Sequence, residues 1–335
     1  MREETISMAH GSGGVAYHEL VEEIFLPAFD NDILAPLGDA AVCELSGNRL
    51  AFTTDSFVVQ PRFFPGGDIG RLAVCGTVND LAMSGATPLY LSCGLILRAG
   101  LPMAELKQVI VSMATAAREA GVSIVTGDTK VVEQGGCDGV YINTAGVGMF
   151  RRAPLDTKPR LGDIVIVSGF LAAHGLAVLA ARQNLDFDPP IASDAAPLHG
   201  LATALLKAAP HTSCMRDPTR GGLAATLHEW AVAARAAITV EEAALPISRP
   251  IGAACDILGL DPLYVANEGV LAAAVPPEQA AAALAALRAH PLGSRAAIIG
   301  RVEAAVEHTP LILHTAVGGE RRIDLPRGEF LPRIC

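Results

Sequence analysis

The stretch GGDIGRLAVCGTVNDLAMSGATPLYLSCGLIL, residues 66–97, indicates the fold class of this chain. Its first part, residues 66–85, is an apolar segment opened by glycines, and it predicts a helix that carries Asn79 and Asp80. Pro88 then leads into an apolar run that predicts a strand. A helix followed directly by an apolar strand is typical of helices packed on a sheet.

The flanking segments continue this alternation in the N-terminal half. Amphipathic helices are predicted over residues 15–29 and 102–120, the second beginning at Pro102 and stopped by Gly121. Strands are predicted over residues 40–45, 50–55, 123–128 and 140–150. We expect the second and third of these strands to end in Asp55 and Asp128.

The second half repeats the mixture after residues 151–163, a charged segment with two prolines that predicts a linker between domains. Predicted elements are strands over 164–169 and 270–275, helices near 174–183, 197–208, 223–234 and 278–289, and loops over 214–222 and 267–269. We therefore expect α/β or α+β domains over 1–150 and 151–325, followed by a mobile tail over 326–335.

Composition excludes several classes of protein. Of the 335 residues, 51% are hydrophobic and 18% are charged, which excludes wholesale disorder. The net charge is −10 without a Lys/Arg block, so neither nucleic acid nor an anionic membrane is an expected partner, and a phosphate ligand would need a divalent metal. The seven cysteines form no C-x-x-C pair and no apolar leader is visible, which favours reduced thiols in the cytoplasm.

Aspartates placed among small residues at the ends of predicted elements are the strongest chemical signal. Helix capping or a turn explains any single one, but five together favour a shared site with Mg²⁺. They are Asp39, Asp55, Asp80, Asp128 and Asp217. Lys130 follows Asp128 by two residues beyond a buried-looking strand, and it is either a phosphate contact or a solvated surface lysine.

Three further segments could bind anions or move protons. HGSGG (residues 10–14) is a glycine segment for phosphates or a plain turn, and its loose G-x-G-x-x-A pattern lacks the preceding buried strand of a dinucleotide site. RDPTRGG (residues 216–222) combines an arginine pair with a possible cap and glycines that open a helix. Asn267-Glu268-Gly269 places an amide and a carboxylate in a turn.

The tail, EFLPRIC, ends in Cys335, which cannot be a prenylation site because that motif needs cysteine fourth from the end. Its prolines favour an extended arm, and the last eight residues could reach about 25 Å. The terminal thiol is either incidental or functional.

The motifs HGSGG, TTDSFVV, FFPGGDIGRLAVCGTVNDLAMSGA, TGDTKVV, RDPTRGG, ANEG and PRIC occur in order over almost the whole chain and together resemble the HypE family of hydrogenase maturation factors. Aminoimidazole ribonucleotide synthetase and selenophosphate synthetase share the wider pattern, whereas PRIC is specific to HypE. The resemblance implies two α/β domains, with the N-terminal mixed sheets of two chains pairing into a homodimer.

The resemblance also implies the reaction. Family members use ATP to dehydrate a carbamoylated C-terminal cysteine to a thiocyanate, the source of the cyano ligand on the iron of [NiFe]-hydrogenase. The implied partners are the carbamoyltransferase HypF and the iron-carrying HypC–HypD complex.

By resemblance, the functional residues have distinct roles. Asp39, Asp55, Asp80 and Asp217 would gather Mg²⁺ and the ATP phosphates. Asp128 and Lys130 would lie at the phosphate or tail site, while Glu268 would accept protons and Cys335 would carry the substrate group. His10, Gly11, Gly13 and Gly14 would close over the nucleotide. The remaining nucleotide-site residues would be Asn79, Arg216, Thr219, Arg220, Gly221 and Asn267.

Two departures from the family pattern leave the metal count open. The chain has Asp39-Ala40 where relatives often have two aspartates, and Ala172-Ala173-His174-Gly175 where many have G-D-H-G. Two alternatives stay open at this point. One is another ATP-dependent synthase of the superfamily acting on a free small molecule, and the other is a non-catalytic thiol carrier.

Overall fold

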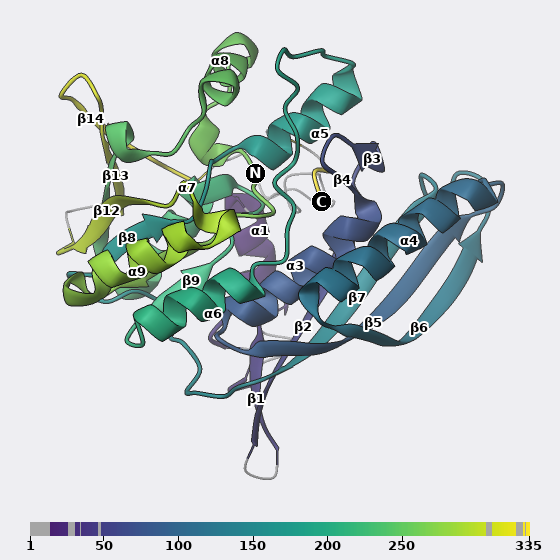
Figure 1. Ribbon diagram of the computed structural model, residues 1–335, viewed down its shortest axis with the longest axis horizontal. Coiled ribbons are helices and arrows are strands. Elements are labelled where there is room, and N and C mark those ends of the chain that lie inside the picture. The colour runs from purple at the N-terminus through teal and green to yellow at the C-terminus, as the bar shows by residue number, and fades with distance from the viewer. Residues whose placement is uncertain are drawn as a thin grey trace.

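The computed structural model describes residues 14–25, 31–33, 35–45, 48–305, 310–325, 331 and 333–335. Two sheets, each covered by helices, form the body of the molecule (Figure 1). Residues 151–163 cross from one sheet to the other without forming a helix or strand. None of the helices in the described ranges combines the length and apolarity needed to cross a membrane.

The N-terminal sheet has five strands in the order β1-β2-β7-β5-β6, with only β5 and β6 parallel. Its strands are β1 (Ala41–Leu45), β2 (Asn48–Phe57), β5 (Thr87–Arg98), β6 (Ser123–Val132) and β7 (Val140–Met149). Helices α3 (Ile69–Met83) and α4 (Met103–Ala120) cover one face, as Figure 1 shows. The sequence predicted all of these elements, and the mixed α/β architecture is confirmed.

Local chemistry fixes the ends of these two helices. The side chain of Asp68 caps α3 by accepting from the backbone N–H groups of Gly70 (2.7 Å) and Arg71 (3.0 Å). α4 follows Pro102 and ends at Gly121, whose φ of 65° is a left-handed conformation that glycine adopts without strain. α3 is buried over most of its length and therefore forms the centre of the molecule.

Two predicted strand ends are wrong. β2 does not end at Asp55 but continues to Phe57. β6 does not end at Asp128 but continues to Val132, and it is exposed along nearly its whole length rather than buried. The face of the sheet opposite α3 and α4 carries exposed apolar side chains, among them Phe52, Tyr90 and Ile96. The apolar character of β6 therefore reflects a surface that this single chain leaves uncovered.

The C-terminal sheet has seven strands in the order β14-β13-β10-β12-β8-β11-β9. Its strands are β8 (Ile164–Val167), β9 (Cys214–Arg216), β10 (Ala237–Glu241), β11 (Ala272–Val275), β12 (Ala297–Glu303), β13 (Leu311–His314) and β14 (Glu320–Arg322). β9 corrects the sequence prediction, which treated its residues as the start of a loop. The segment forms an edge strand because its backbone pairs with β11.

Helices cover both faces of this sheet. The helices of this half are α5 (Ala173–Gln183), α6 (His199–Ala208), α7 (Gly222–Ala234), α8 (Arg249–Leu258) and α9 (Pro277–Ala289), of which α5 and α8 pack on each other in a separate cluster. α6 and α9 pack on one face in a cluster that also includes Ala82 and Met83 of α3, while α7 packs on the other. α3 therefore contacts both sheets and fixes one against the other.

The remaining elements are short. They are α1 (Val15–Leu20) with the π-helical turn η2 (Val21–Phe25), the ribbon β3 (Phe63–Phe64) and β4 (Gly67–Asp68), and the 3₁₀ turns η3 (Glu242–Ala244), η4 (Pro262–Tyr264) and η5 (Pro291–Gly293). The predicted helix over 15–29 is thus present as far as Phe25, and residues 26–29 lie outside the described ranges.

Candidate functional site

Four carboxylates from separate elements gather near the end of α3. Asp80 is on α3, Asp55 on β2, Asp217 follows β9, and Glu268 precedes β11. Burial raises the pKa of Asp80 well above its ordinary value, and the charges of Asp217 and Asp55 add to the rise. The hydroxyl of Thr53 donates to Asp80 Oδ2 at 2.9 Å, and this bond opposes the rise of the pKa because it stabilises the ionised carboxylate.

The neighbouring carboxylates Asp217 and Asp55 also have raised pKa values. Burial raises the pKa of Asp217 to about 7, with the charge of Asp39 adding to the effect. Burial also raises the pKa of Asp55, while the charge of Arg220 opposes the rise. Clustered buried carboxylates of this kind suit a hard cation such as Mg²⁺, which would relieve their repulsion. Within the described residues, however, no three acidic, histidine or cysteine side chains already converge on one metal position.

Asp39 lies at this site and forms an ion pair with Arg216. Its Oδ1 is 3.0 Å from Nε of Arg216, whose Nη1 is 2.6 Å from Oε2 of Glu229. His18 Nε2 lies 3.2 Å from Glu229 Oε1 and extends the network to α1. Sequence analysis missed Glu229 and His18, and the available signal was a charged residue inside the apolar helix LHEWAV. Arg216 is therefore held in place on both sides.

Glu268 is 2% exposed, and burial raises its pKa well above the ordinary value, with Asp217 and Asp55 adding to the rise. Asp194 fixes its loop by accepting from the backbone N–H groups of Glu268 (3.2 Å) and Gly269 (3.1 Å). A Cβ at Gly269 would lie 1.7 Å from the Asp194 carbonyl oxygen, so only glycine fits there. A buried carboxylate with a raised pKa is suited to accepting a proton.

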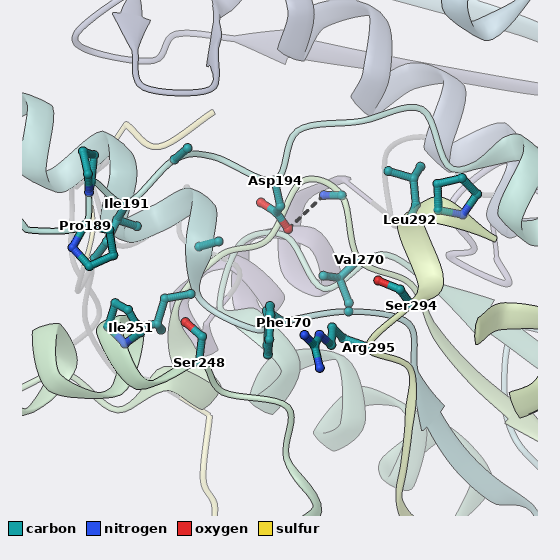
Figure 2. Close-up of a pocket in the computed structure, with 17 residues that line it drawn as sticks. Phe170, Pro189, Ile191, Asp194, Ser248, Ile251, Val270, Leu292, Ser294 and Arg295 are labelled. Atoms are coloured by element: carbon teal, nitrogen blue, oxygen red, sulfur yellow. Dashed lines mark hydrogen bonds between the residues drawn. The ribbon is translucent and has the colours of Figure 1, made fainter. Parts of the chain in front are cut away.

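A cavity of about 470 Å³ lies behind this loop, lined by apolar side chains such as Phe170 and Val270 (Figure 2). Asp194 is on its wall, and the dashed line in Figure 2 marks its bond to the Gly269 N–H. Burial raises the pKa of Asp194 to about 6. Sequence analysis did not identify Asp194, because nothing in SDAAP marks it as the partner of a loop 74 residues away.

The two asparagines predicted to bind nucleotide are fully buried and bonded to protein backbone. Asn79 donates to the Glu268 carbonyl at 3.3 Å and accepts from the Leu198 N–H at 2.7 Å. Asn267 accepts from the Ala172 N–H at 2.7 Å and donates to the Pro218 carbonyl at 2.9 Å. Both therefore hold the Glu268 loop and its neighbours in position.

The last three residues of the chain lie in this site. The backbone N–H of Val58 donates to the Cys335 backbone oxygen (3.1 Å), and the N–H of Gln60 donates to the Arg333 carbonyl (3.2 Å). These two bonds hold the end of the tail alongside residues 58–60, directly after β2. Ile334 is 3% exposed in the N-terminal core cluster. In Figure 1 the C-terminus accordingly lies among α3, α5 and β4.

Docking brings the Cys335 thiol into the field of the carboxylates. Burial raises its pKa to about 12, the charges of Glu268 and Asp55 add to the rise, and Arg220 opposes it. The docked thiol is therefore neutral near pH 7. The other cysteines of the described chain are also free: Cys75, Cys137, Cys214 and Cys255 are buried, and Cys43 and Cys93 are half-buried.

Asp128 and Lys130 lie apart from this cluster. They are exposed on the outer face of β6 and form an ion pair with 2.7 Å between Lys130 Nζ and Asp128 Oδ2. The bond from Lys130 lowers the pKa of Asp128. With Ser56 and Asn143 they line a hollow of about 370 Å³, whereas Asp55 points to the opposite face, toward α3. One chain alone does not bring these two residues to the carboxylates.

The glycine motifs are only partly described. His10, Gly11 and Gly13 lie outside the described residues, and Gly14 is buried at the start of α1. In RDPTRGG, the Thr219 carbonyl accepts from the Gly222 N–H at 2.9 Å. Gly221 adopts a left-handed φ of 78° immediately before α7 begins. The prediction that Gly221 and Gly222 open a helix is confirmed, whereas the possible cap at Thr219 is wrong, because Gly221 is the N-cap and no side chain among the described residues caps α7.

This fold and site define an AIR synthase related protein. The family model for the N-terminal domain, "AIR synthase related protein, N-terminal domain", matches residues 37–150, and the corresponding C-terminal model matches residues 160–311.

Comparison with known proteins narrows the class. The chain is 52% identical to "Carbamoyl dehydratase HypE" of Rhizobium leguminosarum bv. viciae, over 98% of this chain and 95% of the relative. It resembles the solved structure of "Hydrogenase Maturation Protein HypE in complex with ATP", with a TM-score of 0.83 and 48% identity over 99% of this chain and 100% of the other. A HypE–HypF complex gives a TM-score of 0.86 and 44% identity over 92% and 99%. The chain belongs to the HypE family of carbamoyl dehydratases, and the resemblance inferred from its motifs is confirmed.

Proposed function

We propose that this protein uses ATP to dehydrate the S-carbamoyl group on its own Cys335 to a thiocyanate, which supplies the cyano ligand for [NiFe]-hydrogenase iron. The observation that carries the proposal is the docking of the tail, which puts Cys335 in the electrostatic field of Glu268 and Arg220. A synthase acting on a free small molecule does not need its own C-terminus there. A simple thiol carrier does not need a buried base.

The chemistry sets what the site must provide. Conversion of S–C(=O)–NH₂ to S–C≡N removes one oxygen and both N–H protons, and oxide is not a feasible leaving group. Transfer of the γ-phosphoryl group to the carboxamide oxygen, with loss of the first proton, makes phosphate the leaving group. Loss of the second proton with expulsion of phosphate gives the thiocyanate, ADP and phosphate. We assign the proton transfers to Glu268, whose raised pKa suits a general base.

The donor set fits a divalent metal beside the phosphates. We assign Asp55, Asp80 and Asp217 to Mg²⁺, with Asp39 joining them if its ion pair with Arg216 opens. The metal would neutralise phosphate charge and so lower the barrier to phosphoryl transfer. Support for ATP is the relative solved in complex with it. We place the arginine pair of RDPTRGG at the phosphates and the HGSGG segment over the nucleotide.

We further propose a homodimer in which the outer faces of two N-terminal sheets pair. Support comes from the exposed apolar face and the exposed strand β6. In that arrangement residues 1–150 bind ATP and dimerise, residues 151–325 complete the site and residues 326–335 form the tail. Asp128 and Lys130 would then lie under the partner sheet.

The remaining partners follow from the chemistry of the tail. We propose HypF as carbamoyl donor, since a relative is solved as a HypE–HypF complex, and the HypC–HypD complex as the acceptor of the cyano group. We place the reaction in the cytoplasm, where the free cysteines would stay reduced.

Mass spectrometry of the C-terminal peptide tests the proposal. The protein is first treated with a carbamoyltransferase and its donor, and ATP is then added. We expect a carbamoyl adduct on Cys335 that loses one water only when ATP is present. An adduct stable to ATP would favour the thiol carrier, and no adduct at Cys335 would favour a synthase for a free substrate.

A further inference from the structure

Helix α5 holds the docked tail at two points. His174, in its first turn, has Nε2 2.9 Å from the Ile334 carbonyl oxygen. Arg182, in its last turn, donates from Nη2 to the Arg333 carbonyl at 2.8 Å. Consecutive peptide carbonyls of the tail are thus bonded to opposite ends of one helix. We call His174 and Arg182 the α5 clamp.

The surroundings of His174 fix it as a donor to the tail. Burial lowers its pKa to about 4, so the ring is neutral at physiological pH. Ser193 Oγ lies 2.8 Å from Nδ1 and itself accepts from the Ala195 N–H at 3.1 Å, which leaves the hydroxyl proton for Nδ1. Nε2 then carries the ring hydrogen, and a carbonyl oxygen is the partner it requires.

The same helix supports the proposed base. The N–H of Ala172, the residue before α5, donates to Asn267 Oδ1 at 2.7 Å, and the Gly175 N–H donates to the Ala266 carbonyl at 3.1 Å. These contacts hold the loop that carries Glu268. One rigid element therefore sets the position of both the base and the tail.

The docked tail also carries backbone strain that its contacts must offset. Arg333 has a left-handed φ of 55°, an unfavourable conformation for a residue with a side chain. Its side chain donates to the Val58 carbonyl at 3.1 Å and pairs with Asp138. Release of the tail would relieve this strain, so the docked state depends on the bonds that hold it.

We propose that His174 and Arg182 are positioning residues for the dehydration step, and that the α5 clamp sets how often the Cys335 tail leaves the site. Reaction with a carbamoyl donor requires the tail to leave, because docked Cys335 is half-buried and its thiol lies in the field of the carboxylates. Dehydration requires it to return. The inference rests on the proposed function, since positioning matters only if Cys335 carries the reacting group.

Alkylation of the whole protein by iodoacetamide measures tail release, with peptide mass spectrometry resolving Cys335 from half-buried Cys43 as internal reference. His174→Ala removes the donor to the Ile334 carbonyl, and Arg182→Ala removes the donors to the Arg333 and Gln60 carbonyls, so we expect Cys335 to be labelled about tenfold faster. Labelling of Cys43 and binding of ATP should not change. We expect dehydration of the carbamoylated variants to fall by about tenfold or more, because the reacting carbon is misplaced.

Three variants keep the test decisive. His174→Gln retains a donor and should recover part of both effects. Arg182→Ala tests the clamp even if His174→Ala does not fold. His199→Ala replaces a half-buried histidine at the start of α6, beside His290, and should leave both rates unchanged.

Equal labelling of Cys335 in wild type and both clamp variants would overturn the clamp. Faster labelling with unchanged dehydration would overturn the positioning role. If the wild-type adduct lost no water with ATP, the proposed function would fail, whereas the labelling rates would still decide whether α5 holds the tail.

Discussion

The two faces of the N-terminal sheet place the same residue type in opposite environments. On the inner face, burial against α3 raises the pKa of Asp55. On α3 itself, burial raises the pKa of Asp80 further above its ordinary value. On the outer face, Asp128 is exposed and its pKa is lowered by its bond to Lys130. The inner carboxylates are assembled by one chain, and Arg216 and Arg220 offset only part of their charge, whereas the outer pair is neutralised and exposed. This difference is the reason we propose the chemistry for the inner face and a second copy of the chain for the outer face.

The largest effect expected on the inner face is that of Asp80→Asn. We expect loss of turnover by about 10³-fold or more, because a group that stabilises phosphoryl charge is removed. Stability without divalent cations should be equal or higher. The raised pKa means that ionised Asp80 weakens the fold at pH values above its folded pKa, and the amide carries no such charge. Thermal unfolding in EDTA and steady-state assays measure the two effects.

The matched control for this variant is Asp256→Asn, an exposed aspartate on α8. It should change neither turnover nor stability. Calorimetry should also find that ATP binding by the wild-type protein requires Mg²⁺. Equal ATP affinity in EDTA, or normal turnover by Asp80→Asn, would remove the inner carboxylates from the mechanism.

Glu268→Gln tests the role of the proposed base independently of ATP binding. The variant keeps the shape of the side chain but not its basicity, so we expect ATP binding and carbamoylation to persist while dehydration falls about 10²–10⁴-fold. Single-turnover assays on the carbamoylated variant measure the step. Glu278→Gln on α9, an exposed residue, is the control. Wild-type dehydration by Glu268→Gln would assign proton removal to another group.

Mixing two inactive variants tests whether the outer face serves a second chain. If Lys130 of one chain completes the site of its partner, a mixture of Lys130→Ala and Glu268→Gln contains mixed dimers with one intact site. We expect activity to recover to about a quarter of wild type after subunit exchange, as expected for random two-fold pairing. No recovery, with exchange verified by mass spectrometry, would place Lys130 in the site of its own chain or outside any site.

The smallest expected effect concerns the backbone before the α5 clamp. Ala172 has a left-handed φ of 70°, where an alanine is strained and a glycine is not. We therefore expect Ala172→Gly to raise the free energy of unfolding by about 0.5–1 kcal/mol. Ala173→Gly, one residue later in the first turn of α5, should lower it by about the same amount. Chemical denaturation measures both, and a fall in both would show that φ at Ala172 is not the cause.

Local pattern predicted the elements that build the inner face. The glycine-opened apolar run of α3, the amphipathic pattern of α4 and the glycine at 121 suffice to place both helices, because these signals act within one or two turns. No prediction covered β10, β12, β13 or α8. Strand length is not the reason, because β12 has seven residues whereas the predicted strands β8 and β11 have four each. α8 contains Pro250 and Gly252, which weaken a helical pattern.

The site was predictable in its residue types but not in its geometry. Clustered aspartates indicated shared chemistry, yet no local signal joins Asp39 to Arg216, 177 residues away, or Asp194 to the Glu268 loop. The assignment of Lys130 to a position beyond a buried strand was wrong because β6 is an exposed edge. Long-range pairing decides these features, and it depends on the packing of the whole chain.

The most direct test of the account follows the carbamoyl oxygen. Cys335 is carbamoylated with an ¹⁸O-labelled carbonyl, ATP is added, and the inorganic phosphate released in a single turnover is analysed by mass spectrometry. If the carboxamide oxygen is phosphorylated before it leaves, the label will appear in phosphate together with formation of the thiocyanate. Label found in water, with unlabelled phosphate, would contradict the account.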